Sequence, residues 1–222
     1  MNDVLLIIPA YNEEDSIVSL MDKVEKYPQY DYLVIDDGST DHTLSIIEKH
    51  EYHHVRNIVN RGITETMRIG MRYALEKGYK YAVQIDADGQ HDPAYIGAMA
   101  AKADEGYDIV IGSRLIGKKK LNMGTARKTG STLLKGAIRL RTGQTITDPT
   151  SGMRLYDRKA LRFMIRHPEC GPEPSGIAWM IRSGAKVAEV PVVMHDRAYG
   201  KSYLTFHNAS RYMLRELFGI LR

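Results

Sequence analysis

The chain has 222 residues, a formal net charge of +4 and one cysteine, and no linker, internal repeat or low-complexity tract divides it. This length fits one compact α/β domain with an ample core, and the lone Cys170 excludes an intramolecular disulfide and suits a reducing compartment. No segment reaches the roughly 18 apolar residues that span a bilayer, so integral membrane insertion is not expected.

The chain opens with an apolar run that predicts a buried β-strand. Residues 4–8 are apolar, Pro9 is expected to end the strand, and Asn12 is expected to cap a helix that begins near Glu13. The run is too short for a signal peptide, and Asp3 precedes it.

A second apolar run repeats this design. Residues 33–35 predict a strand, the turn-forming sequence DDGS follows at residues 36–39, and Asp41 is expected to cap a helix over residues 43–50.

The stretch YAVQIDADGQHDP, at residues 81–93, is the most informative in the chain. A β-type run ends in Asp86 and Asp88, one residue apart, and Asp92-Pro93 can open a helix. If the strand pleat continues, both carboxylates share one face at the carboxyl end of the strand. Such a pair suits Mg²⁺ or Mn²⁺ shared with the phosphates of a bound nucleotide. Taken alone, the pattern is also that of an acidic strand-to-helix turn.

The rest of the chain continues to alternate strand-like and helix-like segments. Further strands are expected near residues 55–59, 109–112 and 186–193, and helices over residues 64–77, 94–104, 126–141 and 175–183. This alternation predicts a mainly parallel sheet with helices on both faces. Ligands of such sheets bind outside the carboxyl ends of the strands, so the three acid-bearing loops are expected to line one crevice.

Taken together, the motifs of the chain resemble those of a known family. IPAYNEE, VIDDGSTD and QIDADGQHDP, followed by IGSR, TDPTSGMRLYDR, AEVPV and HDRAYGKSYL, look like family 2 inverting glycosyltransferases and cover nearly the whole chain. The polyprenyl-phosphate or dolichyl-phosphate sugar transferases are the closest subgroup, because Arg197, Gly200 and Ser202 match their late Arg-X-X-Gly-X-Ser element. Members often carry Ser-Lys there, whereas this chain has its lysine before the serine, at Lys201.

The resemblance implies a fold and a set of site residues. It implies one GT-A (Rossmann-like) catalytic domain over residues 1–203, followed by an amphipathic C-terminal segment over residues 204–222. It implies a donor site made of Pro9, Ala10, Tyr11, Glu13, Asp37, Gly38, Ser39, Asp86 and Ala87. By the same resemblance, Asp88 and Gln90 would hold Mg²⁺ or Mn²⁺. Its catalytic residues would be Asp86, Asp148 and Arg197, and its acceptor-binding residues Arg154, Arg197, Lys201 and Ser202.

The expected function is inverting transfer of a sugar from a nucleoside diphosphate sugar, a UDP-sugar foremost, to a polyprenyl phosphate such as undecaprenyl phosphate. Such a reaction serves cell-envelope polysaccharide synthesis or glycan modification. A phosphate monoester is largely dianionic at pH 7, so it needs cations such as Arg197 and Lys201 more than a base. A sugar hydroxyl would need a base, for which Asp148 is the candidate unless it only forms the turn before Pro149. Arg154 is equally interpretable as a structural partner of a nearby carboxylate.

Transfer to a saccharide hydroxyl is therefore one alternative, and a non-catalytic membrane-binding module of the same fold is another. The intact Asp86, Asp88 and Arg197 argue against the module.

Two basic segments with interleaved apolar residues predict attachment to an anionic membrane surface. No acidic residue lies between Asp108 and Asp148, whereas nine lysines and arginines do, and residues 203–222 repeat the pattern. A core-docking helix or a dimer contact explains the C-terminal segment equally well. The basic block contains no Phe, Tyr or Trp, so nucleic acid is not an expected partner. The expected location is the cytoplasm, at the inner face of the cell membrane, and a small membrane-protein partner or a homo-oligomer stays open.

Overall fold

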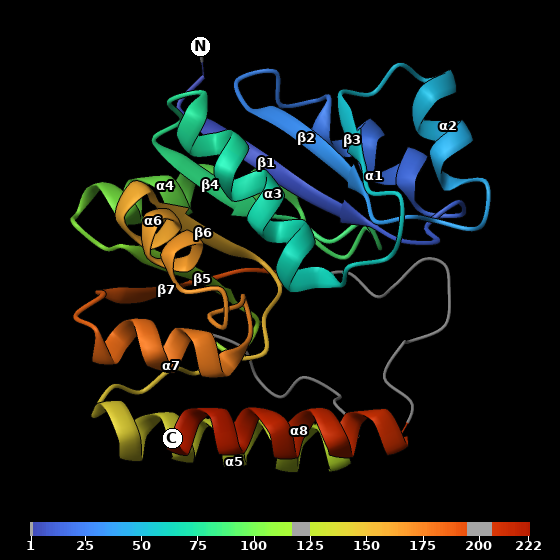
Figure 1. Ribbon diagram of the computed structural model, residues 1–222. Helices are drawn as coiled ribbons and strands as arrows, with labels where there is room; N and C mark the ends of the chain where they lie inside the picture. Colours follow the sequence, from blue (N-terminus) through green and yellow to red (C-terminus); the bar gives the residue numbers. More distant parts are fainter. Residues whose placement is uncertain (1, 117–124, 195–205) are drawn as a thin grey trace.

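The computed structural model describes residues 2–116, 125–194 and 206–222. Seven strands form one sheet in the order β3-β2-β1-β4-β6-β5-β7, with helices on both of its faces (Figure 1). The strands are β1 (Val4–Ala10), β2 (Asp31–Asp36), β3 (His54–Arg56), β4 (Tyr81–Gln84), β5 (Ile109–Ser113), β6 (Arg154–Asp157) and β7 (Val187–Pro191). The α-helices are α1 (Ile17–Val24), α2 (Thr43–Lys49), α3 (Ile63–Glu76), α4 (Ile96–Asp104), α5 (Thr125–Thr142), α6 (Arg158–Arg166), α7 (Pro174–Arg182) and α8 (Phe206–Leu221), and a short 3₁₀ helix, η1 (Pro93–Tyr95), precedes α4.

The sheet is mainly parallel, as the alternation of elements predicts. β1 pairs in parallel with β2 and β4, β2 with β3, and β5 with β7. β6 runs antiparallel between β4 and β5, so β4 and β5 point the same way. The carboxyl ends of the six mutually parallel strands therefore lie along one edge of the sheet.

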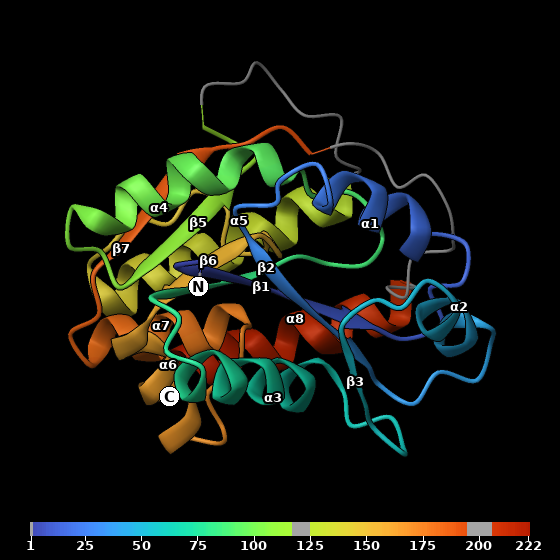
Figure 2. The same ribbon diagram turned by 90° about the horizontal axis from the view of Figure 1, so that it is seen from above.

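Alternate side chains of the central strand β1 enter two separate cores. Leu6 and Ile8 pack on the face covered by α1 and α4, whereas Leu5 and Ile7 pack on the face covered by α3 and α6 (Figure 2). All four side chains are fully buried, which explains why this strand reads as an uninterrupted apolar run.

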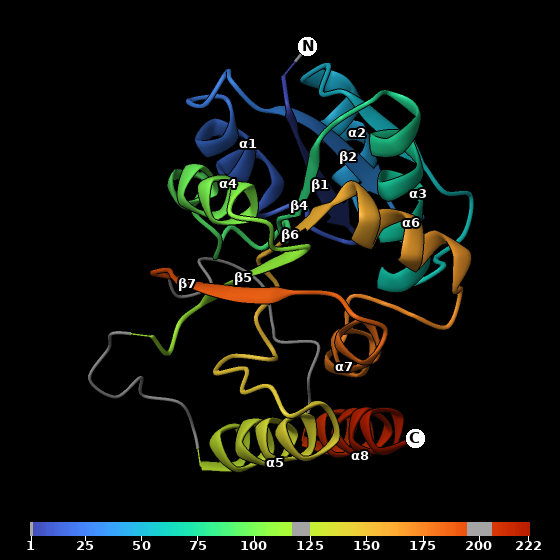
Figure 3. The ribbon, with the colours of Figure 1, turned by 90° about the vertical axis from the view of Figure 1, so that its left-hand side faces the viewer.

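The helices α5 and α8 lie side by side beyond α7 (Figure 3). Leu134 of α5 and Ile220 of α8 are buried in the same core as Leu5 and Ile7. Within the described ranges, no helix is long and apolar enough to cross a membrane.

Three expectations about the N-terminal elements are wrong. Pro9 does not end β1, because pairing with β2 continues through Ala10. Asn12 does not cap a helix near Glu13: its backbone is left-handed, with φ of 55°, and α1 begins only at Ile17. The third strand covers His54–Arg56 rather than residues 55–59, because the chain beyond it turns out into solvent.

Candidate active site

The loops that follow β1 and β2 are tied together at the carboxyl edge of the sheet. The backbone N–H of Asp37 donates to the carbonyl of Ala10 at 2.8 Å, and that of Asn12 donates to Ser39 Oγ at 3.0 Å. A further hydrogen bond joins the same two loops: Asn12 Oδ1 accepts from the Thr40 N–H at 2.8 Å. These bonds bring the predicted donor-binding segments, residues 9–13 and 37–39, against one another.

The buried carboxylate of Asp37 holds a third segment against this pair of loops. It accepts hydrogen bonds from Asn57 Nδ2 at 2.8 Å, from the Arg61 N–H at 3.0 Å and from the Gly62 N–H at 2.8 Å. Gly38 permits the close approach, because a Cβ on it would lie 2.8 Å from the carbonyl carbon of Val59, and its φ of +71° is left-handed. Asp37 thus holds the three segments together, and its contact with a donor stays a prediction.

The acidic loop after β4 is arranged differently from the sequence-based expectation. β4 ends at Gln84 and residues 87–88 lie in a turn, so a continued pleat does not align Asp86 with Asp88. Instead, Gln84 Nε2 donates to Asp86 Oδ1 at 3.0 Å, and Asp88 Oδ1 accepts from the Gln90 N–H at 3.0 Å. Lys23 of α1 secures the turn by donating from Nζ to the Gly89 carbonyl at 3.0 Å.

His91 is the residue of this loop that sequence reasoning missed. Its ring is 2% exposed, and its Nδ1 accepts a hydrogen bond from the Asp86 N–H at 3.0 Å. The neutral ring therefore carries its proton on Nε2, which lies 3.8 Å from Asp86 Oδ2. Gly152 closes the other side, because a Cβ there would overlap the Asp86 carboxylate. The only signal in the sequence is the position of His91 within DADGQHDP.

The donor set of this loop fits a hard divalent cation. Asp86, Asp88 and Gln90 supply carboxylate and amide oxygens, the ligands that Mg²⁺ and Mn²⁺ prefer. Among the described residues, no group of three or more His, Cys, Asp or Glu side chains forms a complete cage. An ion held here would draw its remaining ligands from phosphate oxygens and water.

Asp148, the candidate base, is paired with an arginine. Arg114 Nε donates to Asp148 Oδ2 at 2.7 Å, Arg114 Nη2 donates to Oδ1 at 2.8 Å, and the Arg114 N–H donates to Oδ2 at 3.0 Å. Burial alone would raise the pKa of Asp148, but the hydrogen bonds and charge of Arg114 outweigh it and hold that pKa below its usual range. Arg114 therefore binds both carboxylate oxygens of Asp148. Asp148 forms a structural ion pair and does more than shape the turn before Pro149.

A second carboxylate, on β7, fixes the loop that carries Asp148. Glu189 accepts from the Thr147 N–H at 2.7 Å, from Thr147 Oγ1 at 2.9 Å and from the Asp148 N–H at 2.9 Å. The contact spans about forty residues of sequence, so the AEVPV motif alone does not reveal it.

Arg154 is a buried cation with few partners. It is 2% exposed, and its Nη2 donates to the Pro149 carbonyl at 2.7 Å. Its Nε and Nη1, like the nearby Tyr156 Oη and Gln84 Oε1, have no hydrogen-bond partner within the described part of the chain. Neither of these two nitrogens is bonded to a carboxylate of that part, and whether Arg154 contacts the acceptor or pairs with a carboxylate stays a prediction. Its unmet donors suit an anion.

The remaining predicted site residues divide into two groups. Pro9, Tyr11 and Glu13 are half-buried, whereas Ala10 and Ala87 are buried. Arg197, Lys201 and Ser202 lie outside the described residues, as does the whole predicted acceptor element.

Comparison with known proteins decides the family. The model of Glycosyl transferase family 2 matches residues 5–164. The chain belongs to glycosyltransferase family 2. This family 2 glycosyltransferase is 32% identical to the undecaprenyl-phosphate mannosyltransferase of Micrococcus luteus, over 91% of this chain and 87% of that protein. It is 29% identical to the polyprenol monophosphomannose synthase of Mycolicibacterium smegmatis, over 95% of this chain and 84% of that protein.

Solved structures show that this glycosyltransferase has the GT-A fold. Glucosyl-3-phosphoglycerate synthase from Mycobacterium tuberculosis with phosphoglyceric acid superposes with a TM-score of 0.75 at 20% identity, covering 99% of this chain and 80% of that one. The complex of that enzyme with Mn²⁺ and UDP-glucose gives a TM-score of 0.73 at 18% identity, over 99% of this chain and 79% of that one. The single α/β domain and the enzyme class expected from the motifs are confirmed.

Proposed function

We propose that this glycosyltransferase moves a sugar from a nucleoside diphosphate sugar to a polyprenyl phosphate, with inversion at the anomeric carbon. The observation that carries the proposal is similarity over more than nine-tenths of the chain to an undecaprenyl-phosphate mannosyltransferase and a polyprenol monophosphomannose synthase. A phosphate oxygen of the acceptor attacks the anomeric carbon as the bond from that carbon to the diphosphate oxygen breaks, and the nucleoside diphosphate leaves. A UDP-sugar remains the expected donor.

The residues of the crevice support this chemistry. Asp88 and Gln90, with Asp86 beside them, would hold Mg²⁺ or Mn²⁺, which neutralises the charge that builds on the leaving diphosphate. The chain itself fixes Asp86 through Gln84 and His91, so the carboxylate is oriented before the donor arrives.

The state of Asp148 favours a phosphate acceptor over a saccharide hydroxyl. A hydroxyl must lose its proton to a base, but Asp148 is ion-paired through both oxygens and its pKa is lowered. A phosphate dianion needs cations instead, and we propose that the unmet donors of the buried Arg154 supply one. Arg197 and Lys201 are proposed to complete the acceptor side.

The surface of α5 and α8 supports attachment to the membrane that holds such a lipid. Among the described side chains of these two helices, the exposed large apolar ones are Leu133, Leu140, Leu214, Phe218 and Leu221. Exposed arginines flank them, among them Arg139, Arg141, Arg211 and Arg222. An apolar surface rimmed by cations is typical of interfacial binding to anionic lipids. The opposite side of each helix docks on the core, so α8 is a core-docking helix, and membrane contact is proposed for its exposed side.

The test is transfer from a panel of labelled nucleotide sugars to polyprenyl phosphate in vesicles, with Mg²⁺, Mn²⁺ or excess chelator. The lipid phosphate should be glycosylated only with a divalent ion, and the free polyprenol should be a poor acceptor. Asp88→Ala should abolish turnover and keep the melting temperature, because a loop carboxylate contributes little to the core. Equal transfer to the free alcohol, or full activity in chelator, would falsify the proposal.

A further inference from the structure

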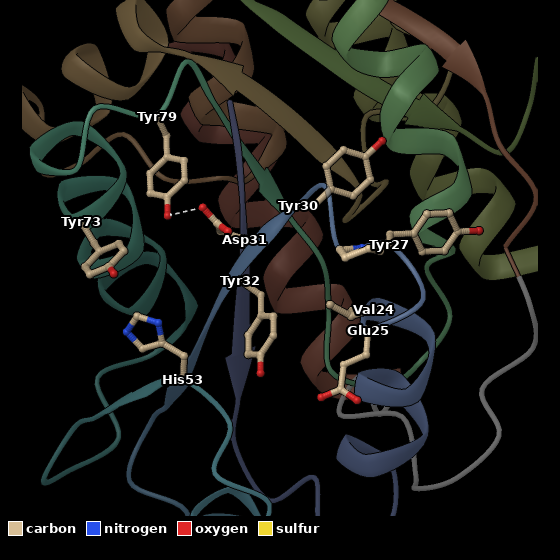
Figure 4. A pocket seen from close by; sticks show the side chains of 10 residues that line it. Val24, Glu25, Tyr27, Tyr30, Asp31, Tyr32, His53, Tyr73 and Tyr79 are labelled. Carbon is tan, nitrogen blue, oxygen red and sulfur yellow. Dashed lines mark hydrogen bonds between the residues drawn. The ribbon is translucent and has the colours of Figure 1, made fainter. Parts of the chain in front are cut away.

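A pocket lined by tyrosines lies at the amino-terminal ends of β2 and β4 (Figure 4). Its volume is about 530 Å³, which is within the range of small-molecule sites. Asp31, which lines the pocket, begins β2, whereas Asp36 ends that strand at the catalytic edge. At about 3.3 Å per residue, the pocket is roughly 17 Å from that edge, so it is separate from the donor crevice. Its tyrosines are Tyr27, Tyr30, Tyr32, Tyr73 and Tyr79.

The pocket contains two carboxylates without a cationic partner in its wall. Asp31 accepts from Tyr79 Oη at 2.8 Å and from Asn2 Nδ2 at 3.0 Å, and both of these donors are neutral. Glu25 is exposed at the end of α1. Among the described residues that line the pocket, none is a lysine or an arginine. The charged side chains that line the pocket are therefore both acidic, whereas the whole chain has a net charge of +4.

Aromatic rings line the pocket beside these carboxylates. Tyr32 stands between His53 and Tyr73 on one side and Glu25 on the other (Figure 4). His53 meets Tyr73 edge to face with ring centroids 5.7 Å apart, and burial raises the pKa of the Tyr32 hydroxyl, with a further rise from the charge of Glu25.

The rings already attract one cation of the protein. Lys77 Nζ lies 5.7 Å from the centroid of the Tyr73 ring, at the margin of the pocket. Faces of tyrosine rings attract organic cations, and carboxylates at their edges add a Coulombic contribution.

We propose that this tyrosine pocket is a binding site for an organic cation, an ammonium or guanidinium group carried by a small solute or by a protein side chain. Charge complementarity with Glu25 and Asp31 selects the cation, and the rings around Tyr32 and Tyr73 supply contact area that a small inorganic ion does not use. A neutral saccharide stacks on tyrosine equally well, but it leaves both carboxylates without a counter-charge.

The experiment compares matched probes by saturation-transfer NMR and titration. Choline is set against 3,3-dimethylbutan-1-ol, its uncharged isostere, with N-acetylarginine amide as the guanidinium probe and methyl α-mannoside as the neutral saccharide. Both cations should bind more tightly than the two neutral probes. Tighter binding of the arginine derivative assigns the group to a protein side chain, and tighter binding of choline assigns it to a solute or lipid headgroup.

Two substitutions locate the site. Glu25→Gln should weaken choline or arginine binding about twofold to fivefold, and Tyr32→Leu about tenfold. Glu48→Gln, which removes an exposed carboxylate on α2 outside the pocket, should leave the affinity unchanged. Because Glu25 is exposed, Glu25→Gln should not destabilise the fold. It therefore tests the site even if Tyr32→Leu lowers the melting temperature. Equal binding of choline and its isostere, or an equal effect of Glu25→Gln and Glu48→Gln, overturns the proposal.

Discussion

His91 fixes the first carboxylate of the acidic loop through the backbone. Its Nδ1 accepts from the Asp86 N–H, and the buried ring has little room to move because Gly152 packs beside it. His91 would act on the proposed metal ligands through Asp86, so we propose it as a positioning residue. Groups of this kind tune metal affinity as well as turnover.

Two substitutions at His91 separate its hydrogen bond from its bulk. Asparagine places an oxygen near the position of Nδ1 and keeps the acceptor, whereas glutamine places its polar group near Nε2 and loses it. We expect His91→Gln to weaken Mn²⁺ binding in the presence of UDP by about tenfold or more, and His91→Asn to weaken it less. Free Mn²⁺ is measured by electron paramagnetic resonance, with the exposed His42→Gln as control. Identical losses in both His91 variants would assign the residue to packing alone.

The ion pair between Asp148 and Arg114 gives a prediction about stability and pH. Because the pKa of Asp148 is lowered in the folded protein, its stabilising effect is present above the pKa of the unfolded chain, about 3.9, and is lost as pH falls through the folded value. Asp148→Asn should therefore cost about 3 kcal/mol in the free energy of unfolding at pH 7, since it leaves Arg114 without its counter-charge. The difference from wild type should shrink below pH 3 in urea unfolding curves. If the difference in unfolding free energy between Asp148→Asn and wild type stays the same from pH 7 to below pH 3, the lowered pKa of Asp148 is contradicted.

At the scale of elements, apolar runs predicted the parallel strands, and tertiary contacts explain what they missed. The apolar sequences of β1 and β2 predicted these strands because their residues are buried on both faces of the sheet. β6 was not predicted because the strand has only four residues and begins with the buried polar Arg154. The role of the Glu189 carboxylate in fixing the Asp148 loop was not predicted either, because its hydrogen-bond partners are distant in sequence.

The donor side of the site was predictable in outline but not in detail. The motifs placed residues 9–13, 37–39 and 86–90 at one edge, because parallel strands end together. They did not reveal which carboxylates face outward, since the hydrogen bonds of Asp37 and Asp148 depend on segments that fold against them.

The exposed face of α5 and α8 gives a prediction at the element scale. Leu214 and Phe218 stand one helical turn apart on α8, are 56% and 73% exposed, and should enter the lipid interface. We expect the double substitution of both residues by serine to weaken partitioning into anionic vesicles at least tenfold without lowering the melting temperature. Ile58→Ser, at a 93% exposed position beyond β3, is the matched control for lost apolar surface. Similar losses in both proteins in a flotation assay would remove α8 from the membrane contact.

On the scale of the whole molecule, the strands that lead to helices α5 and α8 end at the same edge of the sheet as the strands that form the proposed site. β5 and β7 end at the edge where β1, β2 and β4 end, and the chain then passes from β5 to α5 and from β7 to α8. We propose that the lipid phosphate reaches the crevice from a membrane against α5 and α8, so that attachment to the membrane and turnover are coupled.

That coupling predicts different salt responses for two acceptors. Between about 50 and 500 mM salt, the Debye length falls from roughly 14 to 4 Å, so attraction between the arginines of α5 and α8 and anionic lipids is screened. Turnover with polyprenyl phosphate in anionic vesicles should fall about tenfold and follow the loss of vesicle binding. Transfer to a short, water-soluble prenyl phosphate should change little, because that acceptor reaches the crevice without the membrane. Parallel losses with both acceptors would mean that salt acts in the crevice, on Arg154 and the donor phosphates, and that docking does not govern turnover.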